Sequence, residues 1–255
     1  MLKTILVAFL YAYSFVYSFA QPLQVRTLNV KDGLSQGYIS SLFQDSRGFV
    51  WIGTAFGLNR YDGYECRAYL PNNLDQWSLH ANLVFGFAED KTGLLWMGTE
   101  NGLAVMDPYT DRVVHLNALT KEVADLKTRK VLVDGNGKIW FSQETPEGTK
   151  IYAIETDVSL KNSIRNNLKT PYRLRINVVP LPADWQGNLR LLFQTSDSTA
   201  IIANAKGLFY NLNLLNKSIQ PVSKAAFASI IPGQPFLLEN ATAYRRCLHP
   251  CQFRF

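Results

Sequence analysis

A repeat of 45 residues constrains this chain more than any other feature of its sequence. The segment Asp45-Ser-Arg-Gly-Phe-Val-Trp-Ile-Gly-Thr54 returns as Asp90-Lys-Thr-Gly-Leu-Leu-Trp-Met-Gly-Thr99, with Asp, Gly and Trp at one constant offset. A third copy, Asp134-Gly-Asn-Gly-Lys-Ile-Trp140, follows 44 residues later and continues as Phe141-Ser142 in place of Gly-Thr. Fixed periods of about 20–50 residues are typical of arrays in which each unit buries an apolar face against its neighbour.

Each repeated position suits a small antiparallel sheet. An Asp followed three residues later by Gly favours a tight turn, because the carboxylate accepts backbone N–H groups and Gly adopts a positive φ. The segments around Trp51 and Trp96 are apolar on both faces, which predicts strands covered on both sides. Gly57 and Gly102 mark a second hairpin. The repeat residues to which we assign structural roles are Asp45, Gly48, Trp51, Gly53, Gly57, Asp90, Gly93, Trp96, Gly98, Gly102, Asp134, Gly137 and Trp140.

Four short strands in about 45 residues, with one buried Trp per unit, are typical of a β-propeller blade. We therefore predict an all-β fold of four-stranded antiparallel blades that form a partial or incomplete ring. Beyond residue 155 the pattern weakens. Asp184 and Gly187 keep the turn residues but put Arg190 at the Trp position, while residues 200–210 resemble only the second half of a unit. One divergent fourth unit with an insertion and two degenerate units both fit.

The same residues do not favour catalysis. Equivalent Asp residues are expected at equivalent outer turns, far from one another, and equivalent Trp residues are expected in the core rather than in a sugar-stacking set. His80, His115 and His249 stand in no nucleophile motif, and no phosphate-binding Gly-rich loop or zinc-protease motif occurs. The sequence predicts no catalytic residue and no cofactor.

The N-terminus has the order of a secretory signal peptide. A cationic start at Lys3 precedes an apolar run to Tyr17, and Ser18-Phe19-Ala20 provides small residues before a cleavage point. A retained membrane anchor is the alternative. We predict a signal peptide over 1–20, a propeller segment over 21–240, with repeats clearest over 33–155, and an irregular tail over 241–255. Export would place the chain in the periplasm or outside the cell.

Charge and cysteines exclude other classes. The net charge is +6, but the cations are scattered apart from Lys127, Arg129 and Lys130 in one place and an Arg pair in the tail, so we expect no nucleic-acid binding. Three cysteines do not make a disulfide scaffold. Cys247, His249 and Cys251 lie within five residues, which lacks the two-part spacing of a zinc site, so no metal is expected.

At the repeat residues the sequence resembles the two-component regulator propeller family. Asp32-Gly-Leu-Ser35, the repeat units and Asn59-Arg-Tyr-Asp-Gly63 are similar in order and spacing to the opening of hybrid sensor histidine kinases of polysaccharide-degrading bacteria, most closely over residues 27 to 110. In that family, propellers precede an immunoglobulin-like domain, one transmembrane helix, a kinase core for the phosphorelay and usually a receiver with a DNA-binding domain. Ligands there are often glycan fragments. No kinase motif is found in this chain, so no catalytic residue is carried over.

The resemblance implies the extracytoplasmic sensing part of such a regulator. Seven blades need roughly 315 residues, more than the 235 that follow residue 20. We therefore expect about four to five blades, as the N-terminal piece of a longer sensor. In the full-length context we expect a homodimer, anchored in the inner membrane through a segment beyond this chain, with an oligosaccharide as ligand.

Two alternative functions stay open. One is a free-standing secreted propeller that serves as a protein-interaction scaffold, and the other is a propeller glycan hydrolase or lyase. For a sensor, we expect the ligand to bind loops at one end of the blades. The candidate lining residues there are Phe56, Trp77, His80, Glu100 and Asn101.

Overall fold

The computed structural model describes residues 27–168, 172, 174–185 and 187–223. The predicted signal peptide, the irregular tail and the Cys247–Cys251 segment lie outside these residues. The described strands and helices belong to one compact unit. Within the described part of the chain, no helix is both long and apolar enough to cross a membrane.

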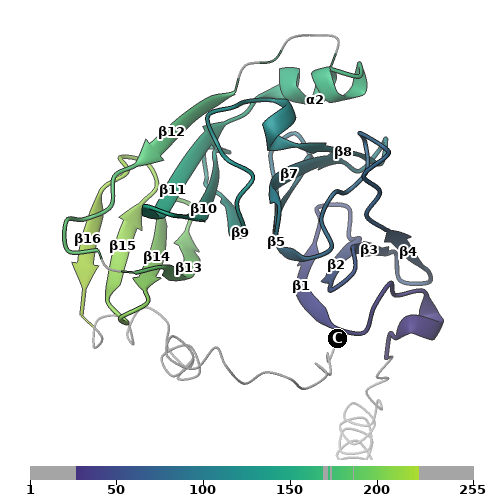
Figure 1. Cartoon of the computed structure of the whole chain (residues 1–255), viewed down its shortest axis with the longest axis horizontal. Coiled ribbons are helices and arrows are strands. Elements are labelled where there is room, and N and C mark those ends of the chain that lie inside the picture. The colour runs from purple at the N-terminus through teal and green to yellow at the C-terminus, as the bar shows by residue number, and fades with distance from the viewer. Residues whose placement is uncertain (1–26, 169–171, 173, 186, 224–255) are drawn as a thin grey trace, which may run out of the picture. The chain divides into compact units, whose positions relative to one another are not determined.

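Sixteen described strands form four antiparallel sheets of four strands each, and every sheet uses consecutive strands (Figure 1). Sheet 1 contains β1 (Ile39–Gln44), β2 (Val50–Thr54), β3 (Leu58–Tyr61) and β4 (Cys66–Tyr69). Sheet 2 contains β5 (Val84–Glu89), β6 (Leu95–Thr99), β7 (Gly102–Asp107) and β8 (Arg112–His115). Sheet 3 contains β9 (Thr128–Val133), β10 (Ile139–Thr145), β11 (Gly148–Glu155) and β12 (Arg175–Val179). Sheet 4 contains β13 (Leu189–Ser196), β14 (Thr199–Asn204), β15 (Phe209–Asn213) and β16 (Ile219–Val222). Three short helices, η1 (Val30–Asp32), η2 (Leu116–Ala118) and α2 (Val158–Arg165), complete the described elements. The predicted fold class of four-stranded propeller blades is confirmed.

The core lies between the sheets rather than inside any one of them. One apolar cluster joins sheets 1 and 2 and includes Trp51, a second joins sheets 2 and 3 and includes Trp96, and a third joins sheets 3 and 4 and includes Trp140. All three indoles are completely buried. Each tryptophan therefore packs its own sheet onto the next sheet along the chain, so no sheet of the described part buries its apolar side chains alone.

The Gly of the Trp-apolar-Gly-Thr segment is required by the neighbouring sheet. A Cβ placed on Gly53 would lie 2.6 Å from the carbonyl oxygen of Val84, and one on Gly98 would lie 2.6 Å from that of Thr128. Both carbonyls belong to the first strand of the next sheet. At these two positions the residue is Gly because a Cβ would clash with the backbone of the adjacent sheet. In sheet 3 Ser142 takes this position, yet the sheet still forms all four strands.

The Thr after that Gly fixes the second hairpin. The Thr99 hydroxyl donates to the Gly102 carbonyl at 2.9 Å and accepts the N–H of Asn101 at 3.1 Å. Thr54 makes the same two bonds around Gly57. Gly57 and Gly102 have φ values of 92° and 103°, as their predicted turn positions require.

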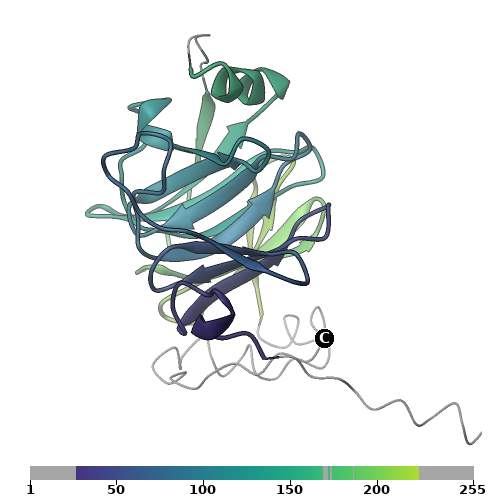
Figure 2. The ribbon, with the colours of Figure 1, turned by 90° about the vertical axis from the view of Figure 1, so that its right-hand side faces the viewer.

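Sheet 3 carries an insertion that the repeat does not contain. Between β11 and β12 the chain forms α2. Asp157 is its N-cap, and the Asp157 carboxylate accepts the N–H of Ser159 at 2.8 Å. Leu160 and Ile164 face the core between sheets 2 and 3. In Figure 2 the helix lies at the edge of the stacked sheets.

The sequence beyond residue 155 fits either one divergent unit or two degenerate ones. In the described residues one sheet, sheet 4, follows sheet 3. The placement of Arg190 at the Trp position is wrong, because Arg190 belongs to β13, the first strand of sheet 4. The turn to the second strand is at Asp197, seven residues later, instead of at Asp184–Gly187. Ile201 of β14 takes the Trp position.

Candidate functional site

The turns between the first and second strands share one hydrogen-bond pattern in sheets 1 to 3. In the first, one Asp45 carboxylate oxygen accepts the N–H groups of Arg47 and Phe49, each at 3.0 Å, and the other accepts the Trp51 indole N–H at 3.0 Å. Asp90 and Asp134 accept the indoles of Trp96 and Trp140 in the same way, each at 2.9 Å. The carboxylate thus ties the turn to the buried Trp six residues later.

Burial alone would raise the pKa of Asp45. The hydrogen bonds from Trp51, Arg47 and Phe49 and the charge of Arg47 outweigh that effect, so the pKa lies below its ordinary value. The Asp45 carboxylate is therefore ionised at neutral pH and committed to the turn, which leaves it no free proton or lone pair for acid–base chemistry in this geometry.

These turns lie side by side, and the expectation that they would be far apart is wrong. Glu89, at the end of β5, accepts both the N–H and the hydroxyl of Ser46 at 2.6 and 2.8 Å. Lys91 donates to the carbonyl of Gly135 at 2.6 Å, and the N–H of Gly135 donates to the carbonyl of Asp197 at 2.8 Å. The first strands of successive sheets, such as β1 and β5, lie next to each other. The turns that follow these strands therefore meet at the same end of the sheets.

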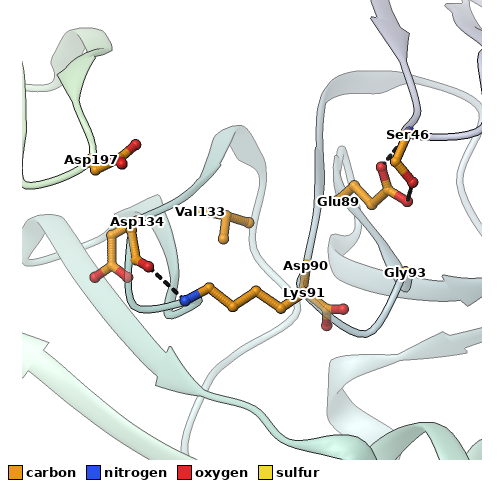
Figure 3. Close-up of a pocket in the computed structure, with 9 residues that line it drawn as sticks. Ser46, Glu89, Asp90, Lys91, Gly93, Val133, Asp134 and Asp197 are labelled. Carbon is orange, nitrogen blue, oxygen red and sulfur yellow. Dashed lines mark hydrogen bonds between the residues drawn. The ribbon is translucent and has the colours of Figure 1, made fainter.

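A pocket of about 450 Å³ lies among these turns (Figure 3). Its lining comes from all four sheets and consists of Ser46, Glu89, Asp90, Lys91, Gly93, Val133, Asp134, Gly135 and Asp197. Figure 3 shows Lys91 extended from its turn toward the next one, with Glu89 beside Ser46 and Asp197 on the far side. We call this the turn pocket.

The turn pocket offers polar groups rather than an apolar surface. Among the described residues, the carboxylate of Asp197 has no hydrogen-bond or salt-bridge partner, so both of its oxygens can accept from a ligand. The Glu89 carboxylate retains lone pairs beyond its two bonds to Ser46, and the Lys91 ammonium has donors beyond its bond to Gly135. Acceptors and donors in this mixture suit a ligand that carries several hydroxyl groups.

Four of the five residues predicted to line a ligand site, namely Phe56, His80, Glu100 and Asn101, lie at the opposite end of the sheets. Trp77 lies along the outer edge of β8, where its carbonyl accepts the N–H of Val113 at 2.8 Å. Three of them are joined there: Asn101 donates to the His80 carbonyl at 2.7 Å, and Glu100 accepts the N–H groups of Asn82 and Leu83 at 2.7 and 3.3 Å. These bonds hold the connection between β4 and β5 in place. Glu100 and Asn101 thus use their polar groups within the protein.

Phe56 and Trp77 occupy different environments. Phe56 is exposed on the β2–β3 hairpin. Trp77 is half-buried, packs against the core between sheets 2 and 3, and lies with its ring 5.3 Å from the Arg112 guanidinium. In the described residues the structure does not bring these two rings together around a cavity.

His80 and His115 form a stacked pair. Their ring centroids are 4.4 Å apart, and Nε2 of His115 accepts the backbone N–H of His80 at 3.1 Å. Burial and the charge of His80 lower the pKa of His115. His80 directs its own Nε2 to the carbonyl of Asp75 at 2.9 Å. Both imidazoles therefore bind backbone groups of one connection.

Over the ranges that the structure describes, no group of three or more His, Cys, Asp or Glu side chains is arranged to hold a metal ion. Sequence reasoning missed Glu89, Lys91 and Asp197 as pocket residues. These residues could have been predicted from two facts: they lie beside the repeated turns, and the first strands of successive blades are neighbours.

The comparisons with known proteins agree with the repeat. The model of the family described as "Two component regulator propeller" matches residues 33–56 and 78–101. A 48-residue stretch, 19% of this chain, is 42% identical to Histidine kinase P4 of Formosa agariphila and covers 4% of that protein.

Solved structures show the same fold. The extracellular domain of a putative hybrid two-component system of B. thetaiotaomicron is 19% identical with a TM-score of 0.56, over 80% of this chain and 27% of that one. A catalytically inactive virginiamycin B lyase of Staphylococcus aureus is 13% identical with a TM-score of 0.54, over 75% of this chain and 57% of that one. The chain thus spans a small part of the kinase and about a quarter of the sensor domain, and the structural likeness shows the propeller fold alone.

Proposed function

Because residues 33–56 and 78–101 are repeats of the two-component regulator propeller family, we propose that the chain is the extracytoplasmic ligand-sensing propeller segment of a hybrid two-component regulator and responds to glycan fragments. The main support for this proposal is that the residues matched by the family model also have defined structural roles in the sheets. The residues matched by the family are those that tie each turn to its buried Trp and each sheet to the next.

The turn pocket supports a glycan as the ligand. Sugar hydroxyls donate to carboxylates and accept from ammonium groups, and the pocket presents Glu89, Asp197 and Lys91 around a volume of about 450 Å³. That volume falls within the usual range of small-ligand sites, about 300–1,000 Å³. A ligand held there would contact turns of several sheets at once.

The same arrangement suits signalling by movement of whole sheets. The sheets are held to one another by apolar clusters that pack tightly, so a ligand that bridges their turns changes how sheets pack instead of unfolding one. In a full-length regulator, a homodimer would pass this change through a membrane helix to the kinase, which transfers phosphate. The role of this chain is to bind, and the signal peptide predicted over residues 1–20 delivers it outside the cytoplasm.

The direct test is thermal unfolding of the purified 255-residue chain with a panel of defined oligosaccharides. A ligand present at 100 times its Kd stabilises the folded state by about 2.7 kcal/mol, which raises the Tm by a few degrees. We expect at least one oligosaccharide to do so and to be recovered uncleaved. Glu89→Gln and Asp197→Asn should each raise its Kd by about fivefold, while Glu122→Gln, an exposed residue outside the pocket, should leave it unchanged.

The alternatives give different outcomes in the same experiment. A hydrolase or lyase would convert the oligosaccharide to products, which chromatography detects. A protein-interaction scaffold would bind none of the panel. Binding that is indifferent to both pocket substitutions would place the ligand elsewhere in the molecule and contradict the assignment of the turn pocket.

A further inference from the structure

Each sheet has an irregularity at the same point of its first strand. In β1 the register shifts between Ile39 and Ser41, in β5 between Val84 and Gly86, and in β13 between Leu189 and Leu191. In sheet 3 the shift falls where Arg129 and Lys130 of β9 together oppose Ser142 of β10. These are β-bulges, and a bulge gives one extra residue to one strand.

The bulge turns two consecutive side chains to one side. In β1, the hydroxyls of Ser40 and Ser41 both donate to the same carbonyl, that of Val84, at 2.6 and 2.8 Å. In a regular strand, neighbouring side chains point to opposite faces. In β9 both Arg129 and Lys130 are exposed, as expected if the equivalent bulge directs both outward.

Arg129 and Lys127 both lie beside an aromatic ring on the neighbouring first strand, and Lys130 follows Arg129 in the chain. The Lys127 ammonium lies 5.0 Å and the Arg129 guanidinium 5.4 Å from the centre of the Phe85 ring. A cation against an aromatic face is held in position but keeps its full charge. We call Phe85, Lys127, Arg129 and Lys130 the basic cluster.

Few negative groups oppose the basic cluster. Glu144 approaches Arg129 at 3.7 Å, with both side chains substantially exposed. Within the described residues, Lys127 and Lys130 have no carboxylate within salt-bridge distance. Lys130 is solvent-exposed, yet nearby protein atoms and the charge of Arg129 lower the pKa of its ammonium. Two cations are thus held against Phe85, a third follows in the chain, and within the described residues one carboxylate, that of Glu144, lies within salt-bridge distance of any of them.

We propose that the basic cluster is a binding site for an oxyanion, that is, a carboxylate or sulfate group of a small ligand. Lys127 and Arg129, oriented by Phe85, contact the oxyanion together with Lys130, and the guanidinium supplies paired N–H donors that match two oxygens. This site lies on the first strands near the β9 start, apart from the turn pocket at the other end of the sheets. The inference does not depend on the sensing role proposed above.

The test is an NMR titration of the full chain with sodium sulfate, against sodium chloride at matched ionic strength. We expect saturable shifts of the Lys127, Arg129 and Lys130 side-chain signals with sulfate. Parallel titrations with D-glucuronate and D-glucose distinguish a sugar-borne carboxylate from a free inorganic oxyanion, because only the charged sugar should compete with sulfate. Competition by D-glucose would overturn the proposal.

Matched charge removals complete the test. Lys127→Gln and Lys130→Gln should each raise the Kd for sulfate about fivefold, and Phe85→Leu should also raise it by releasing the two cations. Lys31→Gln removes one positive charge from η1, outside the cluster, and should change the Kd less than twofold. Equal effects of Lys31→Gln and Lys130→Gln would show a general response to net charge and overturn the proposal, as would non-saturable shifts. If the unaltered protein bound an oligosaccharide at the turn pocket but no oxyanion, the oxyanion proposal would be wrong and the proposed sensing role would be unaffected.

Discussion

At the scale of single residues, the repeat is a set of hydrogen bonds and close approaches. Asp serves both the turn and the Trp indole, Gly makes room for the carbonyl of the next sheet, and Thr closes the second hairpin. Each residue type is needed at its position because its neighbours are fixed by the fold. The Asp and the Trp are present in sheets 1 to 3, whereas the Gly is replaced by Ser142 in sheet 3.

Trp96→Ala should reduce the free energy of unfolding by about 3–5 kcal/mol, the range for large-to-small changes in a core. The indole is fully buried between sheets 2 and 3 and also loses its bond to Asp90. Urea unfolding measures the change. Trp77→Ala is the control: its ring is half-buried beside Arg112, and we expect about 1–2 kcal/mol. Equal stability of Trp96→Ala and the parent would contradict the assigned core.

Gly98→Ala should cost about 1–3 kcal/mol through overpacking. The added methyl would lie 2.6 Å from the Thr128 carbonyl of the adjacent sheet, and a backbone atom cannot move aside alone. Gly37→Ala provides a matched control, since a Cβ there meets no atom within 4 Å. Thermal or urea unfolding of the two variants should separate them clearly, and similar stabilities would remove the steric explanation for this Gly.

At the scale of elements, the connections between strands carry most of the polar chemistry. The β4–β5 connection is held by the stacked His80–His115 pair, and α2 is held to sheet 2 by charges. Arg165 donates to both carboxylate oxygens of Asp107 at 2.6 and 3.3 Å, and Arg112 donates to the carbonyls of Ile164 and Arg165 at 3.2 and 2.8 Å.

The His pair predicts a pH dependence of stability. Burial lowers the pKa of His115 in the folded state. At a pH above the unfolded-state pKa of about 6.5, the ring is neutral in both states and does not change the free energy of unfolding. As the pH falls below that value, the unfolded state takes up the proton first, and stability decreases until the pH passes the folded pKa. We expect the unfolding free energy to drop by about 1 kcal/mol from pH 7.5 to 5.5.

The control for this effect is His115→Gln, whose amide oxygen can still accept the N–H of His80 but does not titrate. That variant should lose most of the dependence between pH 7.5 and 5.5, whereas His80→Gln should lose only a small part of it, because burial is the larger cause of the lowered His115 pKa. The window excludes the carboxylates, because Asp45 and Asp107 have lowered pKa values and lose their contribution only in more acidic solution. An unchanged pH profile in His115→Gln would assign the effect to other groups.

Arg165→Gln should destabilise the protein by about 1–3 kcal/mol, because the carboxylate of Asp107 is fully buried and would lose its charged partner. Arg175→Gln is the comparison. Arg175 is 82% exposed and lies 3.9 Å from Glu155, so its loss should cost less than about 0.5 kcal/mol. Limited proteolysis between β11 and β12 should accelerate in the first variant and remain unchanged in the second.

At the scale of the whole molecule, the sequence predicts the sheets that follow the repeat but does not predict the inserted helix α2. The spacing of Asp45, Trp51 and their copies was enough to give sheets 1 to 3, because each position has a local physical role. The helix α2 interrupts that period, and its signal, Asp157 as a cap before Leu160 and Ile164, is short. The turn pocket could not be read from the motif alone, since Glu89 and Asp197 meet only when sheets are placed side by side.

The nearest-neighbour packing of the sheets predicts a gradient of local stability. In the described part of the chain, sheets 2 and 3 each share apolar clusters with two neighbours, whereas sheets 1 and 4 each share one. Amide hydrogens exchange through local opening, and opening is easier where fewer buried contacts are broken. Hydrogen exchange followed by mass spectrometry should therefore show the slowest exchange in β6 and β10 and faster exchange in the corresponding strands β2 and β14. Trp96→Ala should accelerate exchange in both β6 and β10, because it removes the contact that they share across the interface. Equal protection in all four sheets would show that the outer faces of sheets 1 and 4 are also covered, as they would be in a closed ring.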